Sequence, residues 1–425
     1  MVARVFKSLR RVLSHSLLIE RAVVTSRASQ TRHFTSTTLR PPVNHDHSAL
    51  MKHIIQRITI SGAISVAAYM QEVLTNPLAG YYMKKDVFGQ AGDFITSPEI
   101  TQVFGELIGV WFVHQWMQTG ERDIQIVELG PGRGTLMADI LRVVKKFKAL
   151  QECLSVHLVE VSPALSDIQK TTLTGISEMT NKEPSKENKP YYKQCCSKDG
   201  IPVFWYSSIK DIPKAYSFFL AHEFFDALPI HQFQRTDRGW REVLVDVDKE
   251  RTHSLRFVLA PGPTLASQTY VPKGTSSRQL EVCPQGGVIM EEIGERIRHD
   301  GGSALIIDYG EDGNNRHTLR SFSKHKLHDV LEAPGTADIT ANVDFRFLRQ
   351  AAGSDVNTYG PVTQVSFLKN MGIDQRMRIL LSKASPDQAK QLYSGYKMLT
   401  EEMGEKFKVF AVTDRQSPEP AAVAQ

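Results

Sequence analysis

Residues 124–135 read Ile-Gln-Ile-Val-Glu-Leu-Gly-Pro-Gly-Arg-Gly-Thr, a largely apolar run that leads into three glycines separated by single residues. The apolar run predicts a buried strand, and residues 135–147 predict the helix that follows it. Glycines in such a connection allow a sharp turn and a close approach of the backbone to a ligand. We therefore expect a ligand-binding loop at the start of an α/β core.

The glycine spacing separates two classes of cofactor. A dinucleotide-binding loop has the pattern GxGxxG, whereas here Gly134 comes one residue early and Thr135 takes the reserved place. The shorter loop suits the amino-acid end of S-adenosylmethionine, which has no pyrophosphate for the helix N-terminus. Gly130, Gly132 and Gly134 are the expected loop contacts. Glu128 is either a hydrogen-bond acceptor for the cofactor's ammonium group or a buried structural acceptor.

Strands and helices alternate beyond the loop, which is typical of a parallel sheet covered on both faces. Further strands are predicted at 155–159, 202–206, 216–221 and 303–307, and a hairpin is inserted at 240–259. Glu160, at the end of the second strand, is either a ligand for the ribose hydroxyls or a surface carboxylate. We expect a Rossmann-like class I S-adenosylmethionine-dependent methyltransferase fold with an N-terminal helical preface and C-terminal helical additions.

The N-terminal 40 residues have the composition of a mitochondrial transit peptide. They hold eight Lys or Arg, eleven Ser or Thr and a single acid, Glu20. The alternative is a disordered basic tail. We expect a leader at 1–40, a helical region at 45–120, a methyltransferase domain with insertions at 121–412 and a disordered tail at 413–425.

Charge and cysteine content exclude several function classes. The chain has a formal net charge of +5, but without the leader it holds 43 basic and 45 acidic residues, a net charge of −2. A broad cationic face for nucleic acid is therefore not expected. The four cysteines form no CxxC pair, so no metal site is expected, and no apolar run has the length of a membrane span.

Two acids follow the fourth predicted strand, in the run His-Glu-Phe-Phe-Asp-Ala-Leu-Pro at 222–229. The carboxyl edge of a parallel sheet is where ligands bind, and two carboxylates there can hold a guanidinium. Glu223 and Asp226 are therefore the candidate catalytic pair, the alternative being a loop acid and a helix cap. His222 is either a base or a structural side chain.

Three further polar residues are expected near the same cleft. Asp308 closes the fifth strand, Arg320 lies in the segment that follows, and Asp93 lies in the N-terminal region. Asp308 and Arg320 are assigned to the substrate side and Asp93 to the cofactor side. Each is alternatively a structural residue.

Five motifs resemble the MidA family. They are Pro-Leu-Ala-Gly-Tyr-Tyr at 77–82, Gly-Asp-Phe-Ile-Thr-Ser-Pro-Glu at 92–99, the loop at 128–135, Glu-Phe-Phe-Asp-Ala-Leu-Pro at 223–229 and Asp-Ile-Thr-Ala-Asn-Val-Asp-Phe at 338–345. The resemblance extends from about residue 47 to 412. His222 departs from the pattern, because Asn is expected there in many bacterial members.

The resemblance implies a more specific function than the residues alone. Mitochondrial MidA proteins are protein arginine methyltransferases that act in complex I assembly and symmetrically dimethylate an arginine of a core matrix-arm subunit. A matrix location and this protein partner are therefore expected. Two alternatives stay open: an assembly chaperone that keeps only the cofactor fold, and a methyltransferase for a small molecule or RNA.

Overall fold

A computed structural model describes residues 49–84, 96–176, 189–251, 253–313, 316–323 and 326–423. All of them belong to one compact unit, 47–425. The expected leader at 1–40 and the candidate residue Asp93 lie outside the described residues. Within the described part, no helix combines the length and apolar character needed to cross a bilayer.

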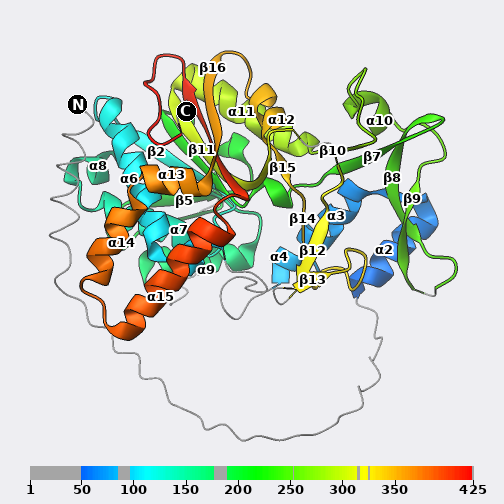
Figure 1. Ribbon diagram of the computed structural model, residues 1–425, viewed down its shortest axis with the longest axis horizontal. Helices are drawn as coiled ribbons and strands as arrows, with labels where there is room; N and C mark the ends of the chain where they lie inside the picture. Colours follow the sequence, from blue (N-terminus) through cyan, green and yellow to red (C-terminus); the bar gives the residue numbers. More distant parts are fainter. Residues whose placement is uncertain are drawn as a thin grey trace, which may run out of the picture. The chain divides into compact units, whose positions relative to one another are not determined.

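The centre of the structure is a mainly parallel sheet of nine strands (Figure 1). Its order is β16-β17-β11-β6-β2-β3-β5-β4, and β15 pairs with β11 in addition. The strands are β2 (Ile124–Leu129), β3 (Leu154–Val159), β4 (Lys193–Cys196), β5 (Pro202–Tyr206), β6 (Ser217–His222), β11 (Gly302–Glu311), β15 (Val343–Asp344), β16 (Val356–Thr363) and β17 (Phe407–Asp414). Pairing reverses at both ends, where β4, β17 and β16 run antiparallel to their neighbours.

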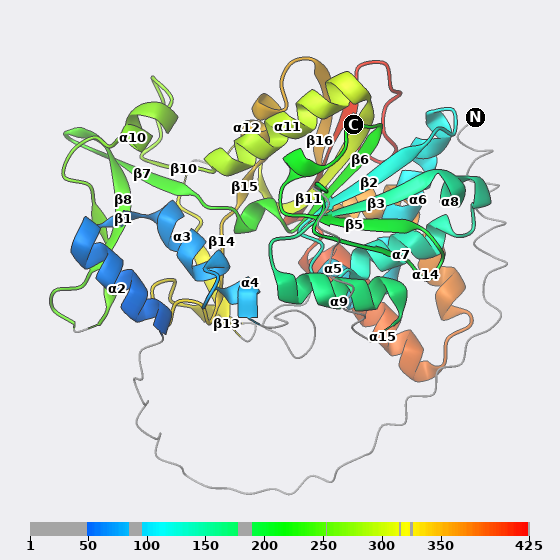
Figure 2. The ribbon, with the colours of Figure 1, turned by 180° about the vertical axis from the view of Figure 1, so that it is seen from behind.

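Helices cover both faces of this sheet, because buried parallel strands are apolar on both sides. On one face, Val127 and Leu129 pack in a core with α11 and α12. On the other, Phe218 stacks on Phe112 of α6. The helices are α6 (Gln102–Gln118), α7 (Thr135–Val144), α8 (Lys148–Cys153), α9 (Pro163–Thr174), α11 (Pro284–Asp300) and α12 (Phe345–Ala351), seen from behind in Figure 2. The strand, loop and helix expected at 124–147 are confirmed, except that α7 ends at Val144.

A second, antiparallel sheet holds the inserted hairpin. Its order is β1-β8-β7-β10, and β9 pairs with β8. Its strands are β1 (Ile64–Ser65), β7 (His231–Thr236), β8 (Gly239–Val247), β9 (Leu255–Leu259) and β10 (Gln279–Val282), and α10 (Leu265–Tyr270) contacts β8. Helices α2 (Ala49–Ser61) and α3 (Val66–Thr75) share a core with Val243 and Val245. The expected helical region 45–120 therefore divides: α2 and α3 pack on the insertion, whereas α6 packs on α7.

Short elements complete the rim of the cleft. A small sheet has the order β13-β12-β14. It consists of β12 (Arg320–Ser323), β13 (Lys326–His328) and β14 (Asp338–Thr340). Two short helices, α4 (Tyr81–Lys84) and α5 (Ser97–Ile100), precede the strands of the main sheet in the chain. The C-terminal helices are α13 (Gln364–Asn370), α14 (Ile373–Leu381), α15 (Pro386–Lys397) and the π-helical η3 (Met398–Glu402), and η1 (Ile209–Asp211) is a single 3-10 turn.

The C-terminal tail differs from its predicted disorder. Strand β17 extends to Asp414, and the chain beyond it packs on the protein as far as Val423. Trp111 Nε1 donates to Ala421 O at 3.0 Å, and Val423 is fully buried. The prolines at 418 and 420 indicated disorder, but buried Pro420 and Val423 and the hydrogen bond from Trp111 hold the segment in place.

Candidate active site

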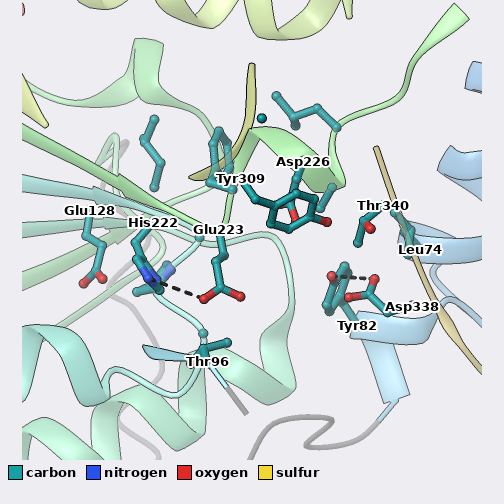
Figure 3. A pocket seen from close by; sticks show the side chains of 18 of the residues that line it. Leu74, Tyr82, Thr96, Glu128, His222, Glu223, Asp226, Tyr309, Asp338 and Thr340 are labelled. Atoms are coloured by element: carbon teal, nitrogen blue, oxygen red, sulfur yellow. Dashed lines mark hydrogen bonds and ion pairs between the residues drawn. The ribbon is translucent and has the colours of Figure 1, made fainter. Parts of the chain in front are cut away.

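A cleft of about 1290 Å³ opens at the carboxyl ends of β2, β3, β6 and β11. Its walls include the glycine loop, the acids after β6 and residues of α3 and β14 (Figure 3). This is the edge at which open α/β sheets bind ligands. Pockets for small ligands usually measure about 300–1,000 Å³. The cleft is therefore large enough for a cofactor together with part of a second molecule.

The glycine loop adopts the backbone that its sequence predicts. Gly130, Gly132 and Gly134 have φ values of 62°, 53° and 79°, in the left-handed region that favours glycine. A Cβ on Gly130 would lie 2.8 Å from the Phe224 ring. The loop can therefore pass close to the turn after β6 only because Gly130 lacks a side chain.

Gln169 on α9 fixes this loop, and it was not among the residues predicted for the site. Its Nε2 donates to Gly132 O at 2.7 Å and to Glu160 Oε2 at 2.9 Å. Its Oε1 accepts the indole N–H of Trp205 at 2.8 Å. One buried amide thus ties the loop to β3 and β5. The sequence signal was only a polar residue among the apolar positions of a helix.

Glu128 meets the requirement for an ammonium ligand. It lines the cleft, is almost fully buried, and its Oε2 has no hydrogen-bond partner among the described residues. Burial raises the pKa of its carboxyl to about 8. An unpartnered buried oxygen is costly, and a bound cation would relieve that cost. The site therefore fits the amino-acid end of S-adenosylmethionine.

Glu160 is also buried at the cleft, but it already has protein partners. Its Oε1 accepts Ser162 N at 2.7 Å, in addition to the Gln169 contact. Burial raises the pKa of Glu160, and these hydrogen bonds lower it. A carboxylate can accept about four hydrogen bonds, so lone pairs remain for ribose hydroxyls. Its assignment to the ribose stays a prediction.

Glu223, in the turn after β6, and Asp226, in the single 3-10 turn η2 (Phe225–Ala227), both line the cleft. Burial, with the charge of Asp226 second, raises the pKa of Glu223 to about 8. Burial raises that of Asp226 to about 6, against a hydrogen bond from Tyr309. The Asp226 Oδ1 has no partner among the described residues. Both acids are therefore placed to receive a cation.

His222 is unsuited to act as a base. Its ring is buried against Phe104, with 5.1 Å between ring centroids. Burial lowers the pKa of His222 to about 3, so the ring is neutral. Its Nε2 lies 3.4 Å from Glu223 Oε1, which is an ion pair only for a protonated ring (Figure 3). We therefore treat His222 as an uncharged side chain that lines the cleft beside Glu223.

Asp308 and Arg320, both expected on the substrate side, occupy different places. Arg320 lines the cleft, donates to Asn342 Oδ1 at 2.7 Å and lies 4.6 Å from the centroid of the Tyr309 ring. Asp308 is fully buried and is not among the residues that line the cleft. The turn after β6 covers its carboxylate, so Asp308 lies behind the substrate side of the cleft and does not line it.

A further acid faces Glu223 from the opposite wall. The Tyr82 hydroxyl donates to Asp338 Oδ1 at 2.8 Å, and both residues line the cleft. Figure 3 shows Glu223 between His222 on one side and this pair on the other. The sequence marked both motifs, 77–82 and 338–345, but it could not show that they meet. Three acids thus surround the space beyond the glycine loop.

The comparisons with known proteins agree with this geometry. Residues 107–362 match a family model described as a putative S-adenosyl-L-methionine-dependent methyltransferase. A Danio rerio protein named "Protein arginine methyltransferase NDUFAF7, mitochondrial" is 53% identical over 371 residues, 86% of this chain and 87% of the relative. The Homo sapiens protein of the same name is 51% identical, over 88% of this chain and 86% of its own.

Solved structures agree on the fold. A COG1565 superfamily member and likely methyl transferase from Burkholderia thailandensis, bound to S-adenosyl-homocysteine, aligns with a TM-score of 0.70 at 23% identity. The alignment covers 88% of this chain and 94% of that one. The fold and cofactor expected from the sequence are confirmed. This chain belongs to the family of S-adenosyl-L-methionine-dependent methyltransferases.

Proposed function

We propose that this protein is a protein arginine N-methyltransferase. The observation that carries the proposal is a group of three acids beside the glycine loop: the partly buried Glu223 and the buried Asp226 and Asp338. Arg320 is a cation that lines the same part of the cleft, and its charge lowers the pKa of Asp226. Buried acids of this kind favour a cationic ligand over a neutral or anionic one. The relatives' names, at about half identity, support arginine as that cation.

The mechanism follows from the positions of the two acids. When bound, S-adenosylmethionine supplies an electrophilic methyl group. Glu223 and Asp226 orient the guanidinium through paired hydrogen bonds, so that one of its nitrogens faces the glycine loop. Transfer to the oriented nitrogen would form the N–CH₃ bond as the S–CH₃ bond breaks, and a carboxylate of the pair would accept the Nη proton. Glu223, with a raised pKa of about 8, is suited to accept it.

We further propose symmetric dimethylation of an arginine in a core matrix-arm subunit of mitochondrial complex I, in support of its assembly. Resemblance to the MidA family supports this target, and the mitochondrial names of the relatives support the compartment. The cleft volume of about 1290 Å³ supports a substrate that brings a peptide chain with its arginine. The matrix location and the transit peptide at 1–40 belong to the same proposal.

Mass spectrometry of mitochondrial proteins tests this target. Cells that lack the protein are complemented with the wild type, with Glu223→Gln, or with Thr171→Ala as a control on the exposed side of α9. We expect symmetric dimethylarginine on one matrix-arm peptide to return with the wild type and the control only. If the dimethylarginine also returns with Glu223→Gln, the proposed role of the acid pair is contradicted. If no methylarginine differs between cells with and without the protein, arginine is not the substrate.

A further inference from the structure

Asp308 lies under the turn that carries both catalytic acids. Its side chain is fully buried on β11, beside β6. Its Oδ2 accepts the N–H groups of Phe224, Phe225 and Asp226 at 3.2, 3.0 and 3.3 Å. Its Oδ1 accepts the N–H of Tyr309 at 2.9 Å. One carboxylate therefore satisfies four backbone donors.

The turn that it holds is strained at Glu223. Glu223 has a φ of 49°, in the left-handed region that side chains other than glycine rarely adopt. A residue of this kind persists only where its surroundings fix it. Glu223 N donates to Ile307 O at 3.0 Å, and the next three N–H groups end on Asp308. Hydrogen bonds to β11 thus fix the backbone of Glu223 and of the three residues that follow it.

An amide side chain of the same size cannot replace all of these contacts. Both oxygens of Asp308 face N–H donors, and an amide offers only one acceptor atom. In Asp308→Asn, the NH₂ group must face either Tyr309 N–H or the three donors of the turn. The substitution therefore removes support from the turn without changing the volume of the core.

We propose that Asp308 is a positioning residue for methyl transfer: its carboxylate holds residues 223–226 in the strained turn that aims Glu223 and Asp226 at the substrate. The inference rests on the proposed function, because Asp308 acts through the two acids assigned there. It assigns Asp308 no contact with cofactor or substrate. A displacement of about 1 Å in a reacting group costs about 100-fold in rate, so loss of this support reduces turnover.

The first test compares Asp308→Asn with a matched control. We expect the variant to fold, to bind S-adenosylmethionine within about threefold of the wild type, and to lose about 10- to 100-fold in kcat on complex I assembly intermediates. The control is Gln125→Ala, which removes a buried side chain that bonds Pro213 and Ser217 at the opposite edge of the sheet. Its kcat should stay at the wild-type value. Wild-type kcat in Asp308→Asn overturns the proposal.

A double-mutant cycle separates positioning from general destabilisation. In a Glu223→Gln background, Asp308→Asn should cost much less than it costs in the wild type, because both changes disable the same turn. An equal fold-loss in both backgrounds overturns the proposal.

Hydrogen exchange supplies a readout that does not depend on activity. The amides of residues 224–226 should exchange at least about tenfold faster in Asp308→Asn and at the wild-type rate in Gln125→Ala. Unchanged protection overturns the positioning role. If Asp308→Asn exchanges faster but the wild type methylates no arginine, the proposed function is contradicted. The role of Asp308 in holding the turn is then still supported.

Discussion

Buried acids hold protons until a cation arrives. Burial raises the pKa of Glu128 and of Glu223 to about 8, from 4.5 in an exposed side chain. An approaching ammonium or guanidinium group favours the ionised form, so binding releases protons. The same residues that stabilise a bound cation therefore cost stability in the unliganded protein.

The raised pKa values of Glu128 and Glu223 predict in which direction stability changes with pH. At Glu128 and Glu223 the folded state binds more protons than the unfolded state between about pH 4.5 and 8, so the contribution of these two groups to the free energy of unfolding falls as pH rises. Each such group contributes at most about 1.4 kcal/mol per pH unit. Glu223→Gln should flatten this slope, and Glu152→Gln, at an exposed position of α8, should not. Urea unfolding at pH 5 to 8 measures it, and parallel slopes for wild type and Glu223→Gln contradict the burial argument.

The sequence predicted the residues whose place in the cleft follows from the end of a strand. It did not predict the residues whose contacts lie far away in the chain. Glu128, Glu223 and Asp226 follow directly from strand ends, because parallel strands bring their carboxyl ends to one edge. Gln169 contacts residues 37 and 36 positions away in the chain, and Tyr82 contacts Asp338 across 256. Only the folded arrangement brings such pairs together.

At the level of elements, α9 supports the glycine loop. Gln169→Ala should leave Gly132 O, Glu160 Oε2 and the Trp205 indole without their shared partner. A lost hydrogen bond of about 1–1.5 kcal/mol corresponds to about a tenfold weaker Kd for S-adenosylmethionine. Calorimetric titration measures this. Thr171→Ala, at an exposed position of the same helix, is the control, and equal affinities for both variants contradict the role of Gln169.

The elements of the core were predicted with the right order, and the strand pairing at the sheet edges was not. Residues 124–147 carry their own signal in an apolar run, glycines and a helical pattern. Residues 407–414 form β17 between β11 and β16, a pairing that depends on partners far away in the chain. An apolar run alone gives neither its neighbours nor its direction.

At the scale of the whole molecule, the C-terminal tail contributes to stability and not to the cleft. Truncation after Gln416 removes buried Val423 and the carbonyl of Ala421 that Trp111 bonds. The loss should be about 2–3 kcal/mol in the free energy of unfolding, from apolar burial and one hydrogen bond. Denaturant unfolding measures it, while the Kd for S-adenosylmethionine should not change. An unchanged midpoint contradicts the packing of the tail.

The central claim divides the cleft into a cofactor half at Gly130–Gly134 and a cation half at Glu223 and Asp226. Glu223→Gln tests that division most directly, by calorimetric titration with S-adenosylmethionine and transfer of its labelled methyl group to complex I assembly intermediates. We expect an affinity close to that of the wild type and a loss of arginine methylation of at least about 100-fold. Methylation at the wild-type rate, or a folded wild type that does not bind S-adenosylmethionine, would contradict the account.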